Sequence, residues 1–153
     1  MNRKIFILLA AMALSIPTIA KAEPEMSELT RKAVEENELT FEVTYISPMG
    51  APSYPSSDGY TLTLSNGVVN AYLPFVGQST QAAFGSDEIG FNFKDCPVKV
   101  KTKKGKKSST LKFSARSGND NVDVTIEIWP DGGANLTCTS SYRSVMHYSG
   151  ELK

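Results

Sequence analysis

Residues 60–77, YTLTLSNGVVNAYLPFVG, contain the turn that decides the fold. Asn66-Gly67 lies between two stretches of alternating residues, and both central positions of a type I′ turn need the positive φ that asparagine and glycine tolerate best. Folding the chain about this turn pairs apolar residues with each other: Leu64 with Val69, Leu62 with Ala71 and Tyr60 with Leu73. A shift by one residue would mix polar and apolar faces. Turn and pattern therefore predict the same antiparallel hairpin.

Alternation with a period of two continues along most of the remaining chain. It predicts further strands at 39–45, 89–94, 98–103, 122–128 and 144–148. Short strands at hairpin spacing are typical of all-β domains. We expect an all-β fold with one N-terminal helix, in which a single antiparallel meander of about eight strands forms a small barrel or a strongly curved sheet. A two-sheet sandwich is the alternative.

Two further turns fix the register of later hairpins. A four-residue loop at Gly105-Lys106-Lys107-Ser108 would pair Val100 with Phe113 and Thr102 with Leu111. Pro130-Asp131-Gly132 fits a three-residue loop, with proline at the first turn position and glycine where the left-handed conformation is needed. That loop would pair Ile126 with Leu136 and Val124 with Cys138.

The first 22 residues have the three parts of a secretory signal peptide. Arg3 and Lys4 give a basic start, an apolar run extends from Ile5 to Ile16, and the segment ends in Ala20-Lys21-Ala22. The apolar run is shorter than the about 20 residues of a membrane-spanning helix, which favours a cleaved signal over an anchor. We expect an exported protein, periplasmic or secreted, in which residues 23–153 form a single domain.

Residues 24–37 form the one stretch with a helical period. Met26, Leu29, Ala33 and Val34 recur at the spacing of one helix face, and Pro24 suits the first turn. The remaining face is charged. The predicted helix therefore lies across one side or one end of the sheet, with its apolar face inward.

The charge balance argues against nucleic acid as a partner. The chain has 16 basic and 16 acidic residues, and removal of the signal peptide leaves a slight acidic excess. Six lysines gather between Lys99 and Lys107, without aromatic residues between them. This pattern favours a solvated strand whose lysines protect a sheet edge over a site for a polyanion.

The chain has two cysteines, Cys96 and Cys138, and one histidine, His147. An exporting compartment permits a disulfide between the cysteines, and two small buried thiols are the alternative. The three residues show none of the ligand spacing of a zinc site, and we expect no metal or cofactor. His147 alternates with Met146 and Tyr148 on a predicted strand, so its ring is expected to point outward. No spacing singles out a catalytic acid pair or a nucleophile beside a base, so we expect a non-enzymatic protein.

The ordered motifs resemble the domain-of-unknown-function family 4251, secreted proteins of Gram-negative bacteria. The residues that carry the resemblance are Pro48-Met49-Gly50, Tyr60 with Leu62, Leu73-Pro74-Phe75-Val76-Gly77, Gly132, Ala134, Leu136, Arg143, Met146, Tyr148 and Gly150. Phe75 stands where the family has tyrosine, and Cys138 where it favours valine. The resemblance implies an exported all-β domain and supplies no activity.

The loops 49–54 and 74–84 contain the best candidates for a binding site. Met49, Tyr54, Phe75 and Phe84 would form the rim of the barrel, and packing of these loops onto the barrel end is the alternative. Arg143 could bind a carboxylate, although a structural role, holding loop carbonyls or an internal acid, is favoured.

The expected function is recognition of a protein or a glycan through these exposed loop aromatics. The alternative is a carrier that holds a small hydrophobic ligand or lipid in the barrel interior. The readable inward positions are Leu, Val, Phe, Ile and Tyr, which fill a small barrel and favour the surface.

Overall fold

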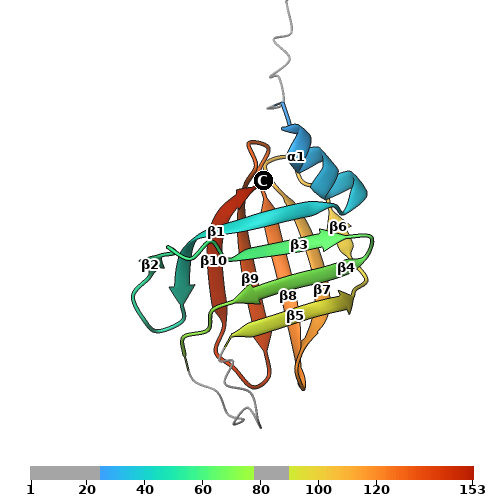
Figure 1. The fold of residues 1–153 in the computed structure, drawn as a ribbon. Helices are drawn as coiled ribbons and strands as arrows, with labels where there is room; N and C mark the ends of the chain where they lie inside the picture. Colours follow the sequence, from blue (N-terminus) through green and yellow to red (C-terminus); the bar gives the residue numbers. More distant parts are fainter. Residues whose placement is uncertain (1–24, 78–89) are drawn as a thin grey trace, which may run out of the picture.

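The computed structural model describes residues 25–77 and 90–153, and in them ten strands follow one short helix (Figure 1). Predictions that concern residues 1–24 and 78–89, among them the signal peptide, Pro24 and Phe84, lie outside the described residues. The elements in chain order are α1 (Glu28–Arg31), a π-helical turn (Lys32–Glu36), β1 (Leu39–Pro48), β2 (Tyr54–Pro55), β3 (Thr61–Ser65), β4 (Val68–Leu73), β5 (Phe91–Pro97), β6 (Lys101–Lys103), β7 (Ser109–Ser117), β8 (Asp120–Ile128), β9 (Gly133–Ser140) and β10 (Met146–Leu152).

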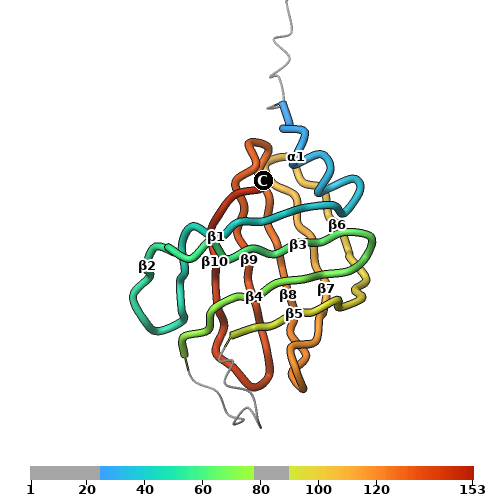
Figure 2. The backbone as a smooth tube through the Cα atoms, viewed as in Figure 1, coloured from blue at the N-terminus to red at the C-terminus, as the bar shows by residue number. Residues whose placement is uncertain are grey.

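Most strands lie beside their neighbours in sequence within one antiparallel sheet. The order is β5-β4-β3-β1-β10-β9-β8-β7-β6, with β2 paired to β1 outside this path. The chain therefore makes two runs of adjacent strands, β1 to β5 and β6 to β10, joined where β1 pairs with β10. The first run crosses the second, so the sheet curls into a half-barrel (Figures 1 and 2). The prediction of an all-β, strongly curved antiparallel sheet is confirmed.

The registers predicted for the hairpins are also confirmed. Asn66 and Gly67 have φ values of 52° and 71°, as a type I′ turn requires. The pairs found as predicted are Leu62 with Ala71, Leu64 with Val69, Thr102 with Leu111, Val124 with Cys138 and Ile126 with Leu136.

The sheet bends where β1 and β10 pair. Their ladder shifts register between Val43 and Tyr45, and such a bulge increases the local twist of a strand. Opposite the bulge, a β-carbon on Gly150 would overlap the carbonyl oxygen of Glu42. The two strands approach so closely at this corner that only glycine fits.

Side chains close the half-barrel where β5 lies against β7. Ser117 Oγ accepts a hydrogen bond from the backbone N–H of Asn92 at 2.9 Å. The thiol of Cys96 donates to the carbonyl oxygen of Arg116 at 3.2 Å. Among the described strands, no backbone ladder joins β5 to β7. We call this side-chain contact between β5 and β7 the seam.

Large apolar side chains fill the inside of the half-barrel. The largest of the fully buried ones are Tyr148, Phe41, Phe91, Phe93, Ile46, Leu62, Leu64, Leu73, Leu111, Ile126, Ile128 and Leu136. The hydroxyl of Tyr148 donates to the carbonyl oxygen of Pro74 at 2.6 Å, so this buried phenol is satisfied and fixes the chain after β4. The described interior is therefore lined by large apolar side chains, of the kinds expected at the inward positions.

The helix begins later than predicted. Ser27 is its N-cap, with Oγ accepting from the backbone N–H of Thr30 at 3.2 Å, and α1 starts at Glu28. The helical segment ends at Asn37, which has the left-handed φ of 54°. A serine cap fixes the start because its side chain satisfies an N–H group of the first turn.

The helical segment buries only half of the apolar face that was predicted, Ala33 and Val34. Thr30, Ala33 and Val34 are buried, whereas Met26 and Leu29 are 40% and 42% exposed. The cause is a polar contact: Thr30 Oγ1 donates to the carbonyl oxygen of Trp129 at 3.0 Å, which turns the threonine toward the β8–β9 connection.

Candidate functional site

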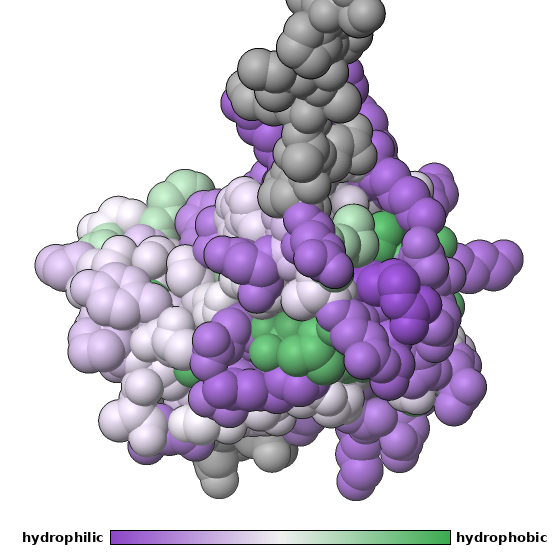
Figure 3. Space-filling view, turned by 90° about the horizontal axis from the view of Figure 1, so that it is seen from above, coloured by the Kyte–Doolittle hydropathy of each residue, from purple (hydrophilic) through white to green (hydrophobic). Residues whose placement is uncertain are grey.

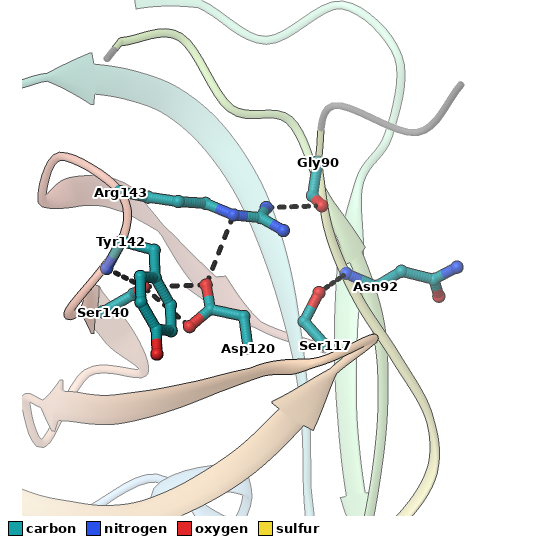
Figure 4. A network of polar contacts seen from close by, with 7 residues as sticks. All are labelled: Gly90, Asn92, Ser117, Asp120, Ser140, Tyr142 and Arg143. Carbon is teal, nitrogen blue, oxygen red and sulfur yellow. Dashed lines mark hydrogen bonds and ion pairs between the residues drawn. The ribbon is translucent and has the colours of Figure 1, made fainter. Parts of the chain in front are cut away.

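A buried ion pair fastens the end of the half-barrel that lies away from the helix (Figure 4). Arg143 Nε lies 3.3 Å from Asp120 Oδ2, and the two side chains are 14% and 8% exposed. Arg143 Nη1 donates to the carbonyl oxygen of Gly90 at 2.9 Å, and the guanidinium carbon lies 4.9 Å from the ring centre of Phe91. One arginine thus connects the β9–β10 loop with the starts of β8 and β5.

Ser140 completes this cluster. Its hydroxyl lies 2.8 and 2.7 Å from the two carboxylate oxygens of Asp120, and its oxygen accepts from the backbone N–H of Tyr142 at 3.0 Å. Asp120 therefore has charged and neutral partners inside the protein, as a buried carboxylate requires. We call Asp120, Ser140 and Arg143 the clamp, because together they hold the loops at this end.

A polar cleft of about 320 Å³ opens beside the clamp. Its lining consists of Asn119, Asn121, Asp123, Thr139, Ser140, Ser141 and Tyr142. Asp123 and Thr139 pair across β8 and β9 and are exposed, so the cleft lies on the outer face of the sheet. Amides, hydroxyls and a carboxylate offer both donors and acceptors here, and Tyr142, which is 37% exposed, adds an aromatic ring.

The loop residues predicted to form a rim have different surroundings. Met49 and Tyr54 are 55% and 36% exposed, as a surface site would need. Phe75, by contrast, is only 8% exposed, so the prediction that it is an exposed aromatic is wrong. Its ring packs edge-on against Phe91 at a centroid distance of 5.7 Å. Phe84 lies outside the described residues.

Arg143 has contacts that match the structural role favoured from the sequence. It holds a loop carbonyl, that of Gly90, and an internal acid, Asp120. Its ring neighbours, Phe75 and Phe91, lie 5.7 and 4.9 Å from the guanidinium carbon. The predicted loop residue Phe75 and Arg143 are therefore brought together, inside the protein.

The disulfide that the sequence permits is not formed, because both cysteines are free. Cys138 lies in β9 and is fully buried in the core, whereas Cys96 lies in β5 at the seam. Burial raises the pKa of the Cys138 thiol above its ordinary value of 9.0. The two cysteines therefore lie on different strands in different surroundings. Of the two, Cys138 matches the predicted alternative to a disulfide, a small buried thiol.

His147 lies on the exposed side of β10, as predicted. Its Nδ1 is 3.0 Å from the hydroxyl of Thr137 on the neighbouring strand. In residues 25–77 and 90–153, no group of three or more histidine, cysteine, aspartate or glutamate side chains is placed to hold a metal ion. The same residues include no helix of sufficient length and hydrophobicity to cross a membrane.

Sequence reasoning missed Asp120, Ser140 and Asn121. Asp120 follows Gly118, which has a φ of 63°, and its surroundings indicated only a turn. The signal that would have found it is the period of two in β8: Asp120 has the same parity as the buried Val122 and Val124. A carboxylate on the inward face of a strand needs a partner, and Arg143 supplies it.

The comparison with known families agrees with the resemblance in the motifs. The sequence model of the family described as Domain of unknown function (DUF4251) matches residues 21–152, which is most of the chain. No curated protein and no solved structure matches. The chain therefore belongs to the DUF4251 family.

Proposed function

We propose that this protein is an exported, non-enzymatic domain that binds a glycan in the polar cleft beside the clamp. The observation that carries the proposal is the lining of that cleft, in which Asn119, Asn121, Asp123 and Thr139 surround a volume of about 320 Å³. Sugar hydroxyls both donate and accept hydrogen bonds, and amide and carboxylate side chains match both functions. Tyr142 provides a ring on which the apolar face of a sugar can pack.

The clamp supports this proposal because it makes the cleft rigid. Ser140 belongs both to the lining and to the clamp, where it bonds to Asp120. Tyr142 is fixed through its backbone N–H to the same serine. A site whose side chains are held before the ligand arrives loses less conformational entropy on binding.

Other features support export and a non-enzymatic role. Residues 1–22 have the pattern of a signal peptide. The hydroxyl of Ser140 donates to a carboxylate, whereas a nucleophilic serine needs a basic partner such as histidine, and His147 contacts Thr137 instead.

A protein partner is the second candidate, favoured by exposed apolar side chains in and between β1 and β2. Tyr54 in β2 lies beside β1, which carries Tyr45, and Met49 follows the end of β1. These three side chains are 36%, 43% and 55% exposed. Exposed aromatic and methionine side chains are enriched in protein interfaces. The small polar cleft gives glycan binding the better geometric support.

The test is a glycan array with residues 23–153, followed by calorimetry with each glycan that binds. We expect one saccharide class to bind, and we expect N121A and Y142A to weaken binding about tenfold each, the loss of one good polar or stacking contact. Asn135 is a matched control, since it is exposed on the outer face of β9 and lies outside the cleft lining. N135A should bind like the wild type.

Two results would contradict the proposal. One is an array without any saccharide binding by protein that is folded by circular dichroism. The other is binding that Y45A and M49S abolish while N121A leaves it unchanged, which would assign the ligand to the second surface.

A further inference from the structure

A second cleft lies at the other end of the molecule, near the N-terminal helix. It has a volume of about 220 Å³ and is lined by Met26, Lys104, Gly105, Lys106, Lys107, Ser108, Ser109, Ile128 and Pro130. The view onto this end shows apolar areas bordered by hydrophilic residues (Figure 3). This end carries no part of the clamp or of the polar cleft.

Three lysines give this cleft a positive charge that is only partly compensated. Lys104 Nζ lies 3.7 Å from a carboxylate oxygen of Glu35. Lys106 and Lys107 form no ion pair within the described part of the chain. A nearby acid, Glu127, accepts a hydrogen bond from Ser108 at 2.7 Å. Two ammonium groups are therefore available to an anion.

Protection of a sheet edge explains only some of the lysines. Lys101 and Lys103 belong to β6, the edge strand, where exposed lysines prevent pairing with another chain. Lys104, Lys106 and Lys107 come after this strand, in the loop to β7. A β-carbon on Gly105 would overlap the carbonyl oxygen of Ser108, so the loop is tightly turned and gathers its lysines at one place.

The opposite wall of the cleft is apolar. Met26 precedes the N-cap Ser27 and is 40% exposed. The backbone N–H of Ser27 donates to the carbonyl oxygen of Pro130 at 2.8 Å, which holds Met26 beside the proline. A methionine side chain adapts its shape readily to an apolar ligand.

We propose that this cleft binds a single amphiphilic anion, an alkyl phosphate or alkyl carboxylate. The anionic head lies among Lys104, Lys106 and Lys107, and the first part of the alkyl chain packs on Met26 and Pro130. This site is separate from the proposed glycan cleft and does not depend on it. The small volume admits a head group and a few methylene groups, whereas the rest of a longer chain would extend into solvent.

The test is calorimetry with octyl phosphate below the concentration at which it forms micelles. Inorganic phosphate and octanol are the two partial ligands, and both should bind at least about tenfold more weakly, because each lacks one half of the interaction. The double variant K106E/K107E should weaken octyl phosphate binding about tenfold or more, and M26S severalfold. K101E/K103E carries the same charge change on β6, outside the cleft, and should bind like the wild type.

Three results would overturn the proposal. Inorganic phosphate that binds as tightly as octyl phosphate would show contact with the charges alone. Equal losses in K106E/K107E and K101E/K103E would show a general effect of net charge. Binding to vesicles that contain anionic phospholipid, without binding of monomeric octyl phosphate, would show a membrane-facing surface instead of a cleft for one molecule.

Discussion

Gly150 pairs with Val43 at the point where the β1–β10 ladder changes register. A β-carbon at this position would overlap the carbonyl oxygen of Glu42 and would also lie 3.0 Å from the ring of Phe41. Both neighbours are fixed, since one is backbone in a ladder and the other is a fully buried side chain. Gly150 is one of the residues that carried the family resemblance, and close approach of two strands gives it a physical role.

We therefore expect G150A to destabilise the domain by about 2–3 kcal/mol, the upper part of the usual range for overpacking, because backbone must move. The measurement is urea unfolding followed by tryptophan fluorescence. Gly133, opposite Glu151 on β9, is a matched control because the nearest obstacle to its β-carbon is not backbone but the exposed carboxylate of Asp131 at 3.2 Å. G133A should cost less than about 1 kcal/mol. An equal loss in the free energy of unfolding for the two variants would contradict the claim that the close approach of β1 and β10 requires glycine at position 150.

The surroundings of Gly150 also show how far the sequence alone predicts the last strand. The last strand was predicted at 144–148, whereas β10 extends from Met146 to Leu152. Glycine often interrupts a strand, and the local pattern does not distinguish this from glycine required by a second strand passing close by. The partner strand, β1, is about a hundred residues earlier in the chain, beyond any local signal.

Among the elements, β5 and β7 are joined at the seam by side chains instead of a backbone ladder. A ladder would provide a regular series of backbone hydrogen bonds, but here Ser117 bonds to Asn92 and Cys96 bonds to Arg116 through their side chains. Ser117 is only 4% exposed, so its bond is shielded from water. Opening of β5 away from β7 is therefore expected to cost less than separation of the laddered strands.

S117A should remove the hydrogen bond to Asn92 and destabilise the domain by about 1–2 kcal/mol. Faster hydrogen exchange is expected in β5, while the β8–β9 ladder keeps its protection. Ser114 is a matched control on the same strand, because it is exposed and bonds to the surface carboxylate of Asp123. S114A should change stability by less than about 0.5 kcal/mol. Uniform exchange changes in all strands after S117A would argue against a seam that opens by itself.

Element prediction succeeded where neighbouring residues decide the structure. The Asn66-Gly67 turn and the Pro130-Asp131-Gly132 loop specify hairpins through φ preferences and loop length, and their registers were predictable. The helix was less predictable, because its buried face depends on the contact of Thr30 with Trp129. Hydrophobic spacing predicted Ala33 and Val34 correctly, whereas Thr30, through one hydrogen bond across the fold, takes the buried place expected of Met26 and Leu29.

For the whole molecule, the alternation of polar and apolar residues predicted a curved sheet. It did not predict which distant strands pair or which site the surface forms. The pairing of β1 with β10 and the seam bring together residues far apart in sequence. The same holds for the clamp, in which Asp120 and Arg143 come from separate connections. The polar cleft beside it depends on that arrangement. A candidate site made of ordinary asparagine, threonine and serine residues has no sequence motif, so the sequence analysis selected the loop aromatics instead.

The core as a whole also links stability to alkaline pH. Burial is the main cause that raises the pKa of Cys138 and of Tyr148 above their ordinary values of 9.0 and 10.0. Both groups keep their protons in the folded protein at pH values where the unfolded chain releases them. The unfolded state then binds fewer protons, so the free energy of unfolding falls as pH rises. The stabilisation is fully present below pH 9.0 and is lost progressively above it.

Urea unfolding between pH 7 and pH 11 measures this dependence. Each group that titrates only in the unfolded state contributes a slope of about 1.4 kcal/mol per pH unit. We expect C138V to flatten the curve from about pH 9, and Y148F to flatten it from about pH 10. Y148F should also lower stability at neutral pH by about 1 kcal/mol, because the bond to Pro74 is lost. A wild-type slope in C138V would mean that this thiol ionises in the folded protein, contrary to its burial in the core.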